Sequence, residues 1–122
     1  LSIGTNDLAQ YTMAADRMSA DLATLTDPWQ PGVLALVAKT ARAGQAVSKP
    51  VGVCGEAAAD PLLACVLTGL GITSLSAAAS AVTPVGAKLA SVSLAQCREA
   101  AEAVLHASSP LGAREAASAI LG

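Results

Sequence analysis

Polar and reactive side chains follow two short apolar segments of this sequence. Asn6 and Asp7 come directly after the first segment, and Cys54 and Glu56 stand at the end of the second. If the two segments are parallel strands, an amide, a thiol and two carboxylates meet at the carboxyl edge of the sheet, where such proteins place their active sites. The pattern therefore predicts a candidate active site at that edge.

Each of these side chains has a chemical use and an ordinary structural alternative. The Asp7 carboxylate is a hard oxygen ligand that suits Mg²⁺, but Asn and Asp after a strand also cap helices. The Cys54 thiol would act as a nucleophile or as a proton donor, or it is a small buried apolar group. Glu56 would support the site, or it caps the next helix.

Arg17 lies in the long polar segment after the first strand. Its guanidinium suits a phosphate or a carboxylate, and the alternative is a solvated loop charge that pairs with Asp16 or Asp21. The only histidine, His106, is expected in the last turn of a helix, far from the strand ends. The sequence contains no C-x-x-C pair, no P-loop and no G-x-G-x-x-G, so zinc and nucleotide motifs are absent.

Three apolar segments are predicted to be buried parallel strands: Leu1–Gly4, Pro50–Cys54 and Ile72–Ser76. Residues 5–31, which follow the first strand, are polar, and we predict that this segment is irregular. The alternation of strands and helices predicts βαβ units in an α/β fold. Three units are too few to close a (β/α)₈ barrel, which needs about 250 residues, so we expect the sequence to be part of a larger protein.

Helix signals separate and follow these strands. Gly44 is predicted to cap the end of the first helix. The side chains of Cys65 and Cys97 fall on apolar helix faces and are expected in the core. The predicted helix starts are Pro31, Pro61 after the cap Asp60, Thr83–Pro84, the residue after Ser93 in a capping box, and Pro110.

Composition excludes several classes of protein. Hydrophobic residues make up 53% and charged residues 13%, which argues against intrinsic disorder. Seven basic residues, nine acidic residues and 2% aromatics provide no surface for nucleic acid. The most apolar stretch, Pro61–Leu70, is too short to span a membrane. Three irregularly spaced cysteines predict free thiols in a reducing cytoplasm.

Two longer motifs carry a family resemblance. Ser2–Thr12 with Ala14–Arg17, and then Val53–Pro61, resemble two signatures of the phosphoenolpyruvate-utilising enzymes in their usual order. The residues of these motifs most resemble those of the phosphoenolpyruvate-protein phosphotransferases, enzyme I of the bacterial sugar phosphotransferase system. The resemblance spans nearly the whole chain. It implies the last three βα units of a (β/α)₈ TIM barrel over residues 1–91, followed by C-terminal helices over residues 92–122.

The resemblance also implies a role for each candidate residue. Asp7 would coordinate a Mg²⁺ ion that bridges the carboxylate and phosphate of the substrate, and Asn6 would contact the phosphoryl group. Arg17 would hold the phosphate as the P–O bond breaks. Cys54 would protonate the enolate at carbon to give pyruvate.

The implied reaction moves phosphate from phosphoenolpyruvate to a protein histidine. That histidine would lie in an N-terminal domain that this sequence lacks, and it would pass the phosphate to a histidine-containing phosphocarrier protein. We therefore expect the chain alone to be inactive, and the family implies a homodimer formed through the barrel. The alternatives are the same barrel region of pyruvate phosphate dikinase or phosphoenolpyruvate synthase, or a noncatalytic dimerisation and assembly module.

Overall fold

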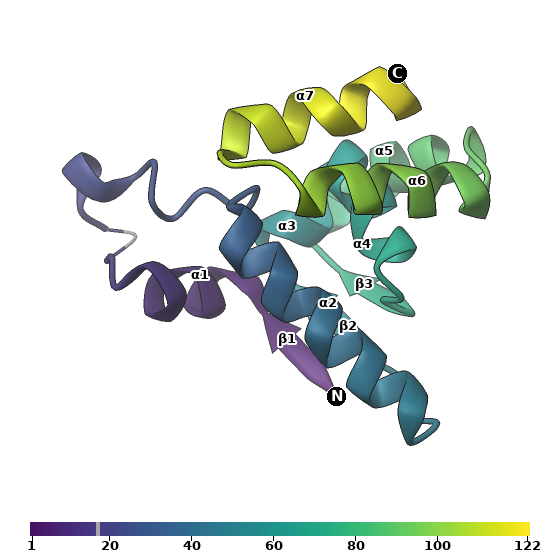
Figure 1. Cartoon of the computed structure of the whole chain (residues 1–122), viewed down its shortest axis with the longest axis horizontal. Coiled ribbons are helices and arrows are strands. Elements are labelled where there is room, and N and C mark those ends of the chain that lie inside the picture. Colours follow the sequence, from purple (N-terminus) through teal and green to yellow (C-terminus); the bar gives the residue numbers. More distant parts are fainter. Residues whose placement is uncertain (17) are drawn as a thin grey trace.

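Three short parallel strands form the sheet of this α/β protein. The computed structural model describes residues 1–16 and 18–122. The strands β1 (Ser2–Gly4), β2 (Gly52–Cys54) and β3 (Ser74–Ser76) lie in that order, with β2 in the centre (Figure 1). All three predicted strands are confirmed, although each is shorter than the apolar segment that predicts it.

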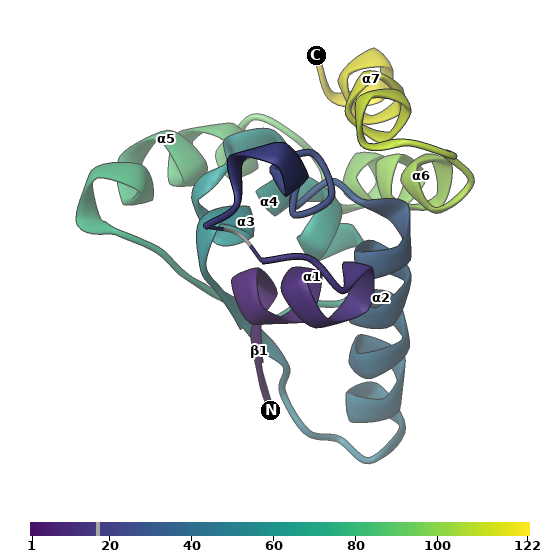
Figure 2. The ribbon, with the colours of Figure 1, turned by 90° about the vertical axis from the view of Figure 1, so that its left-hand side faces the viewer.

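Helices connect the strands and then continue beyond them. In the part of the chain that the structure describes, no helix is both long and apolar enough to cross a bilayer. The helix α4 (Pro61–Gly69) packs against both α5 (Ala79–Ala90) and α6 (Leu94–Leu105), and α7 (Pro110–Leu121) packs on α6 (Figure 2). The helices are α1 (Thr5–Met13), the 3₁₀ helix η1 (Ala20–Leu22), α2 (Pro31–Ala46), α3 (Glu56–Ala59), α4 (Pro61–Gly69), α5 (Ala79–Ala90), α6 (Leu94–Leu105) and α7 (Pro110–Leu121).

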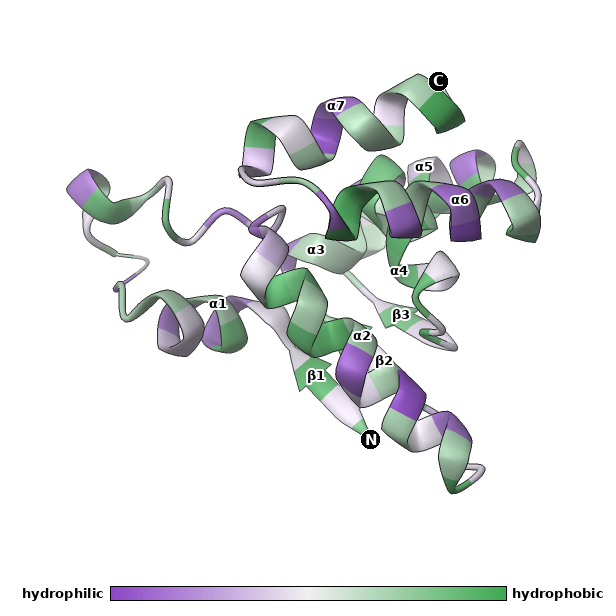
Figure 3. Ribbon diagram, in the orientation of Figure 1, coloured by the Kyte–Doolittle hydropathy of each residue, from purple (hydrophilic) through white to green (hydrophobic). Residues whose placement is uncertain are grey.

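The two faces of the sheet differ in character. The register aligns Ile3, Val53 and Leu75 on one face, and Val53 is buried in the core. This face contacts the apolar sides of α2 and α4, which hydropathy colouring shows in green (Figure 3). The opposite face carries only small residues: Ser2, Gly4, Gly52, Cys54, Ser74 and Ser76. One face therefore stabilises the fold, and the other remains partly open to solvent.

The start of the polar stretch after β1 is helical, so the prediction of an irregular segment over residues 5–31 is wrong there. α1 begins directly after the strand and ends at Met13, and the next residue, Ala14, adopts a left-handed conformation with φ 51°. The start of α1 was not predicted because its N-cap residue, Gly4, has no side chain that could cap the helix and so signal its start. Burial of Thr5 and Ala9, one helical turn apart, fixes α1 against the rest of the chain.

Gly44 does not end α2, contrary to the prediction. The helix continues to Ala46, and Gly44 lies inside it. A Cβ atom on Gly44 would lie 2.5 Å from Cγ2 of Val51 and 2.9 Å from the carbonyl oxygen of Lys49. The residue is small because the returning chain crosses the helix closely, not because a cap requires glycine.

The predicted start of α5 at Thr83–Pro84 is also wrong. The helix begins at Ala79, and Pro84 lies within it. Proline in this position removes the hydrogen bond to the Ser80 carbonyl. Both residues are exposed, so solvent can satisfy the freed carbonyl and the helix persists.

The other predicted helix starts are confirmed, and all of them except Pro31 follow a residue whose side chain caps the helix. Asp60 accepts hydrogen bonds from the backbone N–H groups of Leu62 and Leu63 at the start of α4. Ser93 and Gln96 form the predicted capping box of α6. The hydroxyl of Ser109 accepts a hydrogen bond from the third residue of α7.

Candidate functional site

Two hydrogen bonds join the first turn of α1 to the end of β2. The Thr5 hydroxyl donates to the Cys54 carbonyl at 3.0 Å. The amide oxygen of Asn6 accepts from the backbone N–H of Glu56 at 3.3 Å. The structure thus brings the two predicted segments together at the carboxyl edge of the sheet.

Gly55 makes this close contact possible. Its φ is +110°, a conformation that L side chains rarely adopt. A Cβ atom there would lie 2.9 Å from the Thr5 hydroxyl oxygen and 3.1 Å from Oδ1 of Asn6. Sequence reasoning did not single out Gly55 or Thr5, although a glycine that directly follows a strand is a signal for a special backbone conformation.

An open hollow of about 470 Å³ lies at the ends of the three strands, and we call it the strand-end hollow. Its polar groups are the Asn6 amide, the Glu56 carboxylate and the Ser76 hydroxyl. Its volume falls within the range of small-molecule sites. The lining residues are Asn6, Gly55, Glu56, Ala59, Ser76, Ala77 and Ala78.

Cys54 lies beside this hollow on the open face of the sheet. Its thiol is free and half-buried, and Sγ donates a weak hydrogen bond to the Ile3 carbonyl at 3.6 Å. Gly4 and Ser76 are its register partners on the neighbouring strands. Because those neighbours are small, the thiol lies on a surface that a ligand can approach.

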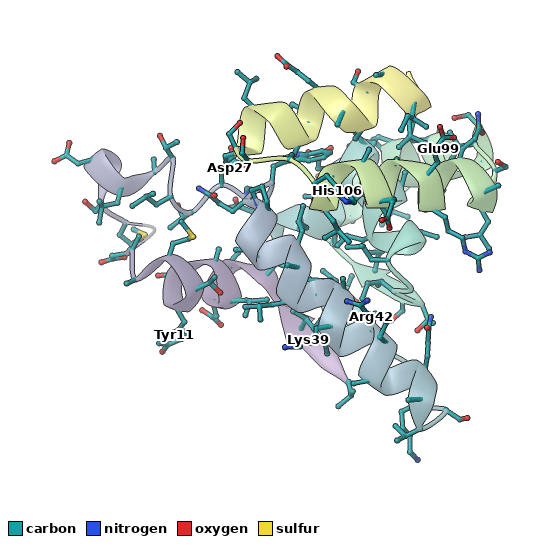
Figure 4. The ribbon with its side chains drawn as sticks, viewed as in Figure 1. Tyr11, Asp27, Lys39, Arg42, Glu99 and His106 are labelled. Atoms are coloured by element: carbon teal, nitrogen blue, oxygen red, sulfur yellow. The ribbon has the colours of Figure 1, made fainter. Side chains whose placement is uncertain are left out.

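Asp7 faces a different hollow from its neighbour Asn6. Its exposed carboxylate lines this hollow with Gln10, Tyr11 and Asp16, and Figure 4 shows Tyr11 on α1; Oδ2 of Asp7 would lie 3.7 Å from a Cβ atom on Gly4 at the end of β1. The structure therefore does not bring Asp7 and Asn6 into one hollow. Arg17, the predicted phosphate ligand, lies outside the described residues.

A second hollow of about 600 Å³ adjoins the strand-end hollow, and we call it the side cleft. The two share Asn6 and Glu56. On its far wall lie Asp27, next to the start of α7 (Figure 4), and Arg114 from α7 itself. Arg114 is the one basic side chain among the described residues that line this cleft.

Three residues that sequence reasoning did not connect meet behind the side cleft. The indole N–H of Trp29 donates to Oδ2 of Asp60 at 2.9 Å. The Arg114 guanidinium lies 3.4 Å from the same oxygen and 5.0 Å from the centroid of the Trp29 ring. Asp60 was predicted only as a helix cap. No local pattern marks a contact between residues so far apart in sequence.

The other cysteines and the histidine lie away from the site. Cys65 and Cys97 are buried, as predicted. Burial, followed by the neighbouring Cys97 thiol, raises the pKa of Cys65 to about 11, and burial also raises the pKa of Cys97. Both thiols therefore stay protonated and unreactive at neutral pH. His106 is exposed at the end of α6, with Nδ1 2.8 Å from the Glu102 carbonyl (Figure 4).

The part of the sequence that forms the strand-end hollow matches a known protein family. Residues 1–94 match the family model described as PEP-utilising enzyme, PEP-binding domain, where PEP is phosphoenolpyruvate. A phosphoenolpyruvate-protein phosphotransferase of Streptomyces coelicolor is 60% identical over 121 residues, which are 99% of this chain and 22% of the relative. The protein of the same name from Geobacillus stearothermophilus is 41% identical over 104 residues, which are 85% of this chain and 18% of the relative.

A differently named relative matches the same region. The multiphosphoryl transfer protein of Rhodobacter capsulatus is 45% identical over 104 residues, which are 85% of this chain and 13% of that protein. The chain thus spans about a fifth or less of the length of these relatives. The family match includes all three strands and both segments that form the strand-end hollow. The chain therefore belongs to the family of PEP-utilising enzymes, and residues 1–94 lie in its PEP-binding domain.

Proposed function

We propose that this chain forms part of the PEP-binding domain of a phosphoenolpyruvate-protein phosphotransferase. The enzyme would transfer phosphate from PEP to a protein histidine and release pyruvate. The proposal rests on one observation. The two segments that carry the family motifs meet at the strand-end hollow, where Asn6 accepts a hydrogen bond from the backbone N–H of Glu56. The names of the most similar relatives favour this activity over that of a dikinase or a synthase.

The phosphoryl group would be held by Asn6 and Arg17. Because Oδ1 of Asn6 already accepts from Glu56, its amide nitrogen is left to donate to a phosphoryl oxygen. The guanidinium of Arg17 would form paired hydrogen bonds to the phosphate. As the P–O bond breaks, the phosphoryl group bonds to the imidazole nitrogen of the accepting histidine, and the enolate of pyruvate remains.

Cys54 would complete the reaction as the general acid. Its S–H bond breaks, the proton moves to the methylene carbon of the enolate, and pyruvate forms. The resulting thiolate recovers a proton from water. The position of Cys54 supports this role, because its free, half-buried thiol lies on the open face of the sheet between the small residues Gly4 and Ser76.

Asp7 fits a magnesium ion as a single carboxylate ligand. No described side chain pairs with it, and the described residues contain no cluster of three or more His, Cys, Asp or Glu side chains that would hold a metal alone. Mg²⁺ commonly takes one or two protein carboxylates and fills its other positions with water and substrate oxygens. Asp7 would hold the ion, which when bound neutralises charge on the carboxylate and phosphate of the substrate.

The larger architecture that we propose is a (β/α)₈ TIM barrel. Residues 1–91 would form its last three βα units, and residues 92–122 the helices that follow. Support comes from the small residues on the open face of the sheet and from β1 and β3, each of which pairs with only one described strand. We place the enzyme in the cytoplasm, because all three cysteines are free thiols.

The accepting histidine and the partner protein would lie outside this chain. A domain of the longer enzyme would carry the histidine and pass the phosphate to a histidine-containing phosphocarrier protein. The 122-residue chain alone is therefore expected to transfer no phosphate. Transfer from PEP to a phosphocarrier protein by the chain alone would contradict this part of the proposal.

Calorimetric titration of oxalate, a mimic of the enolate of pyruvate, tests the site directly. Binding to this chain is expected with Mg²⁺ and not without it, and Asp7→Ala should abolish it. Glu99→Ala is the matched control, because this exposed carboxylate lies on α6, away from the site (Figure 4). Absence of binding by the unmodified chain, or equal loss in both variants, would overturn the assignment of Asp7.

We further propose that the chain forms a homodimer. The edges of β1 and β3 are open within the described residues, and the large apolar side chains of Leu94 and Leu111 are exposed. Light scattering should give a mass near twice 11.9 kDa. A mass of 11.9 kDa at every concentration tested would contradict it.

A further inference from the structure

Trp29, Asp60 and Arg114 connect three segments that are distant in sequence. Trp29 precedes α2, Asp60 caps α4, and Arg114 lies in α7. Oδ2 of Asp60 lies 2.9 Å from the Trp29 indole nitrogen and 3.4 Å from the Arg114 guanidinium, which also lies over the Trp29 ring. Arg114 therefore contacts both partners of the hydrogen bond between Trp29 and Asp60.

Two members of this cluster are fixed by other contacts as well. Trp29 is 0% exposed. The other oxygen of Asp60 accepts hydrogen bonds from the first turn of α4. Arg114 is different, because its side chain is 51% exposed and makes no other hydrogen bond with the described residues. Its place is set by the carboxylate and by the face of the indole, both of which attract a planar cation.

Hydrogen bonds join Trp29 to the rest of the segment Thr24–Gln30. The Asp27 carboxylate accepts a hydrogen bond from the backbone N–H of Trp29 at 2.8 Å. The Gln30 side chain donates to the Thr24 carbonyl at 3.1 Å and closes the segment into one unit. Contacts that hold Trp29 in place therefore also hold the segment Thr24–Gln30 in place.

This unit forms a wall of the side cleft. Thr26 and Asp27 line the cleft together with Asn6, Glu56 and Arg114. The unit belongs to the chain segment that follows β1, and Asp60 belongs to the segment that follows β2. The hydrogen bond between Trp29 and Asp60 thus joins the two segments that carry the proposed site, and Arg114 contacts both of its partners.

We propose that Arg114 is a positioning residue, which holds Thr24–Gln30 against Asp60 and so fixes the shape of the PEP site. The inference rests on the proposed function. It goes beyond the family match, which ends at residue 94, whereas Arg114 lies in the last helix. It makes α7 part of the site, although α7 supplies no group to the chemistry.

Amide hydrogen exchange and quenching of Trp29 fluorescence test the inference in this chain, which has a single Trp. Arg114→Met is expected to raise two quantities about fivefold: the amide exchange rates over Thr24–Gln30 and the acrylamide quenching constant of Trp29. Arg114→Lys keeps the charge but loses the planar group, so it should restore only part of the protection. The melting temperature should change little, because a half-exposed ion pair contributes little to stability.

Arg98→Met is the matched control. Arg98 is exposed on α6 and has no ion-pair or hydrogen-bond partner among the described residues, so its loss should leave exchange and quenching unchanged. Equal exchange and quenching in Arg114→Met and the unmodified chain would overturn the inference. So would an equal increase in both variants.

Oxalate binding separates this inference from the proposed function. If the unmodified chain binds oxalate with Mg²⁺, Arg114→Met should raise the Kd about fivefold and Arg98→Met should not. An unchanged Kd in Arg114→Met would overturn the positioning role. If the unmodified chain does not bind, the proposed site fails in this chain, and exchange and quenching alone decide whether Arg114 holds the segment.

Discussion

The Thr5 hydroxyl donates a hydrogen bond to the Cys54 carbonyl across 49 positions of sequence, at 3.0 Å. Thr5 is the first residue of α1, and Cys54 is the last residue of β2. The bond therefore joins a helix start to a neighbouring strand end. It holds Asn6 close enough to accept from the backbone of Glu56, so the geometry of the strand-end hollow depends on it.

Replacing Thr5 by Val should destabilise the chain by about 1–2 kcal/mol. The shape of the side chain is kept, but the buried hydroxyl is lost and the Cys54 carbonyl loses a donor. Urea unfolding measures the change. Thr5→Ser is the control, because it keeps the hydroxyl and removes only a methyl group. A serine variant less stable than the valine variant would show that packing, and not the hydrogen bond, is what matters at this position.

Replacing Gly55 by Ala should cost about 1–3 kcal/mol of stability, because alanine is strained at φ +110°. The new methyl group would also push against the Thr5 hydroxyl and the Asn6 amide. We therefore expect Gly55→Ala to lose Mg²⁺-dependent oxalate binding as well.

Gly86→Ala provides the control for this substitution. Gly86 lies inside α5, and a Cβ atom there would meet nothing within 4 Å. Alanine should stabilise that helix by about 0.5–1 kcal/mol. Thermal unfolding of the two variants measures the contrast. A Gly55→Ala chain as stable as the unmodified protein would contradict the strain argument.

Replacing Asp60 by Ala should destabilise the chain by about 2–4 kcal/mol. The change removes the N-cap of α4 and leaves the buried indole N–H of Trp29 without an acceptor. Urea unfolding followed by Trp29 fluorescence reports both effects. Asp21→Ala removes an exposed carboxylate in η1 and should have little effect. Similar losses in the two variants would show that the Asp60 contacts do not stabilise the fold.

Local signals predicted much of the fold. The Asp60 and Ser93 caps were predicted correctly because each satisfies helix N–H groups within a few residues. The strands were found because each is apolar at its centre. By contrast, no side chain caps the start of α1, so no local signal marks it. Gly44 and Pro84 lie within helices because of their surroundings in the fold, which no local sequence pattern indicates.

The site was predictable only in part, for a related reason. The polar residues that follow the strands predicted a site at this edge of the sheet, and Asn6 does line the strand-end hollow. Trp29 and Arg114 could not be assigned to the side cleft, because their contacts with Asp60 span 31 and 54 positions. The separation of Asp7 from Asn6 into different hollows depends on the direction of the side chains around α1, which requires the helix itself to be known.

Stability should fall in alkaline solution because of Cys65. Burial raises the pKa of this thiol from 9.0 to about 11, so the folded chain holds the proton more tightly than the unfolded chain does. The resulting stabilisation is fully present below pH 9 and is lost as the pH rises through about 11. Urea midpoints measured from pH 8 to pH 11 should therefore decline. Cys65→Ala, although less stable at pH 8, should decline less steeply, because the other alkaline titrations are common to both chains. Parallel curves for the two proteins would show that Cys65 does not contribute to the pH dependence.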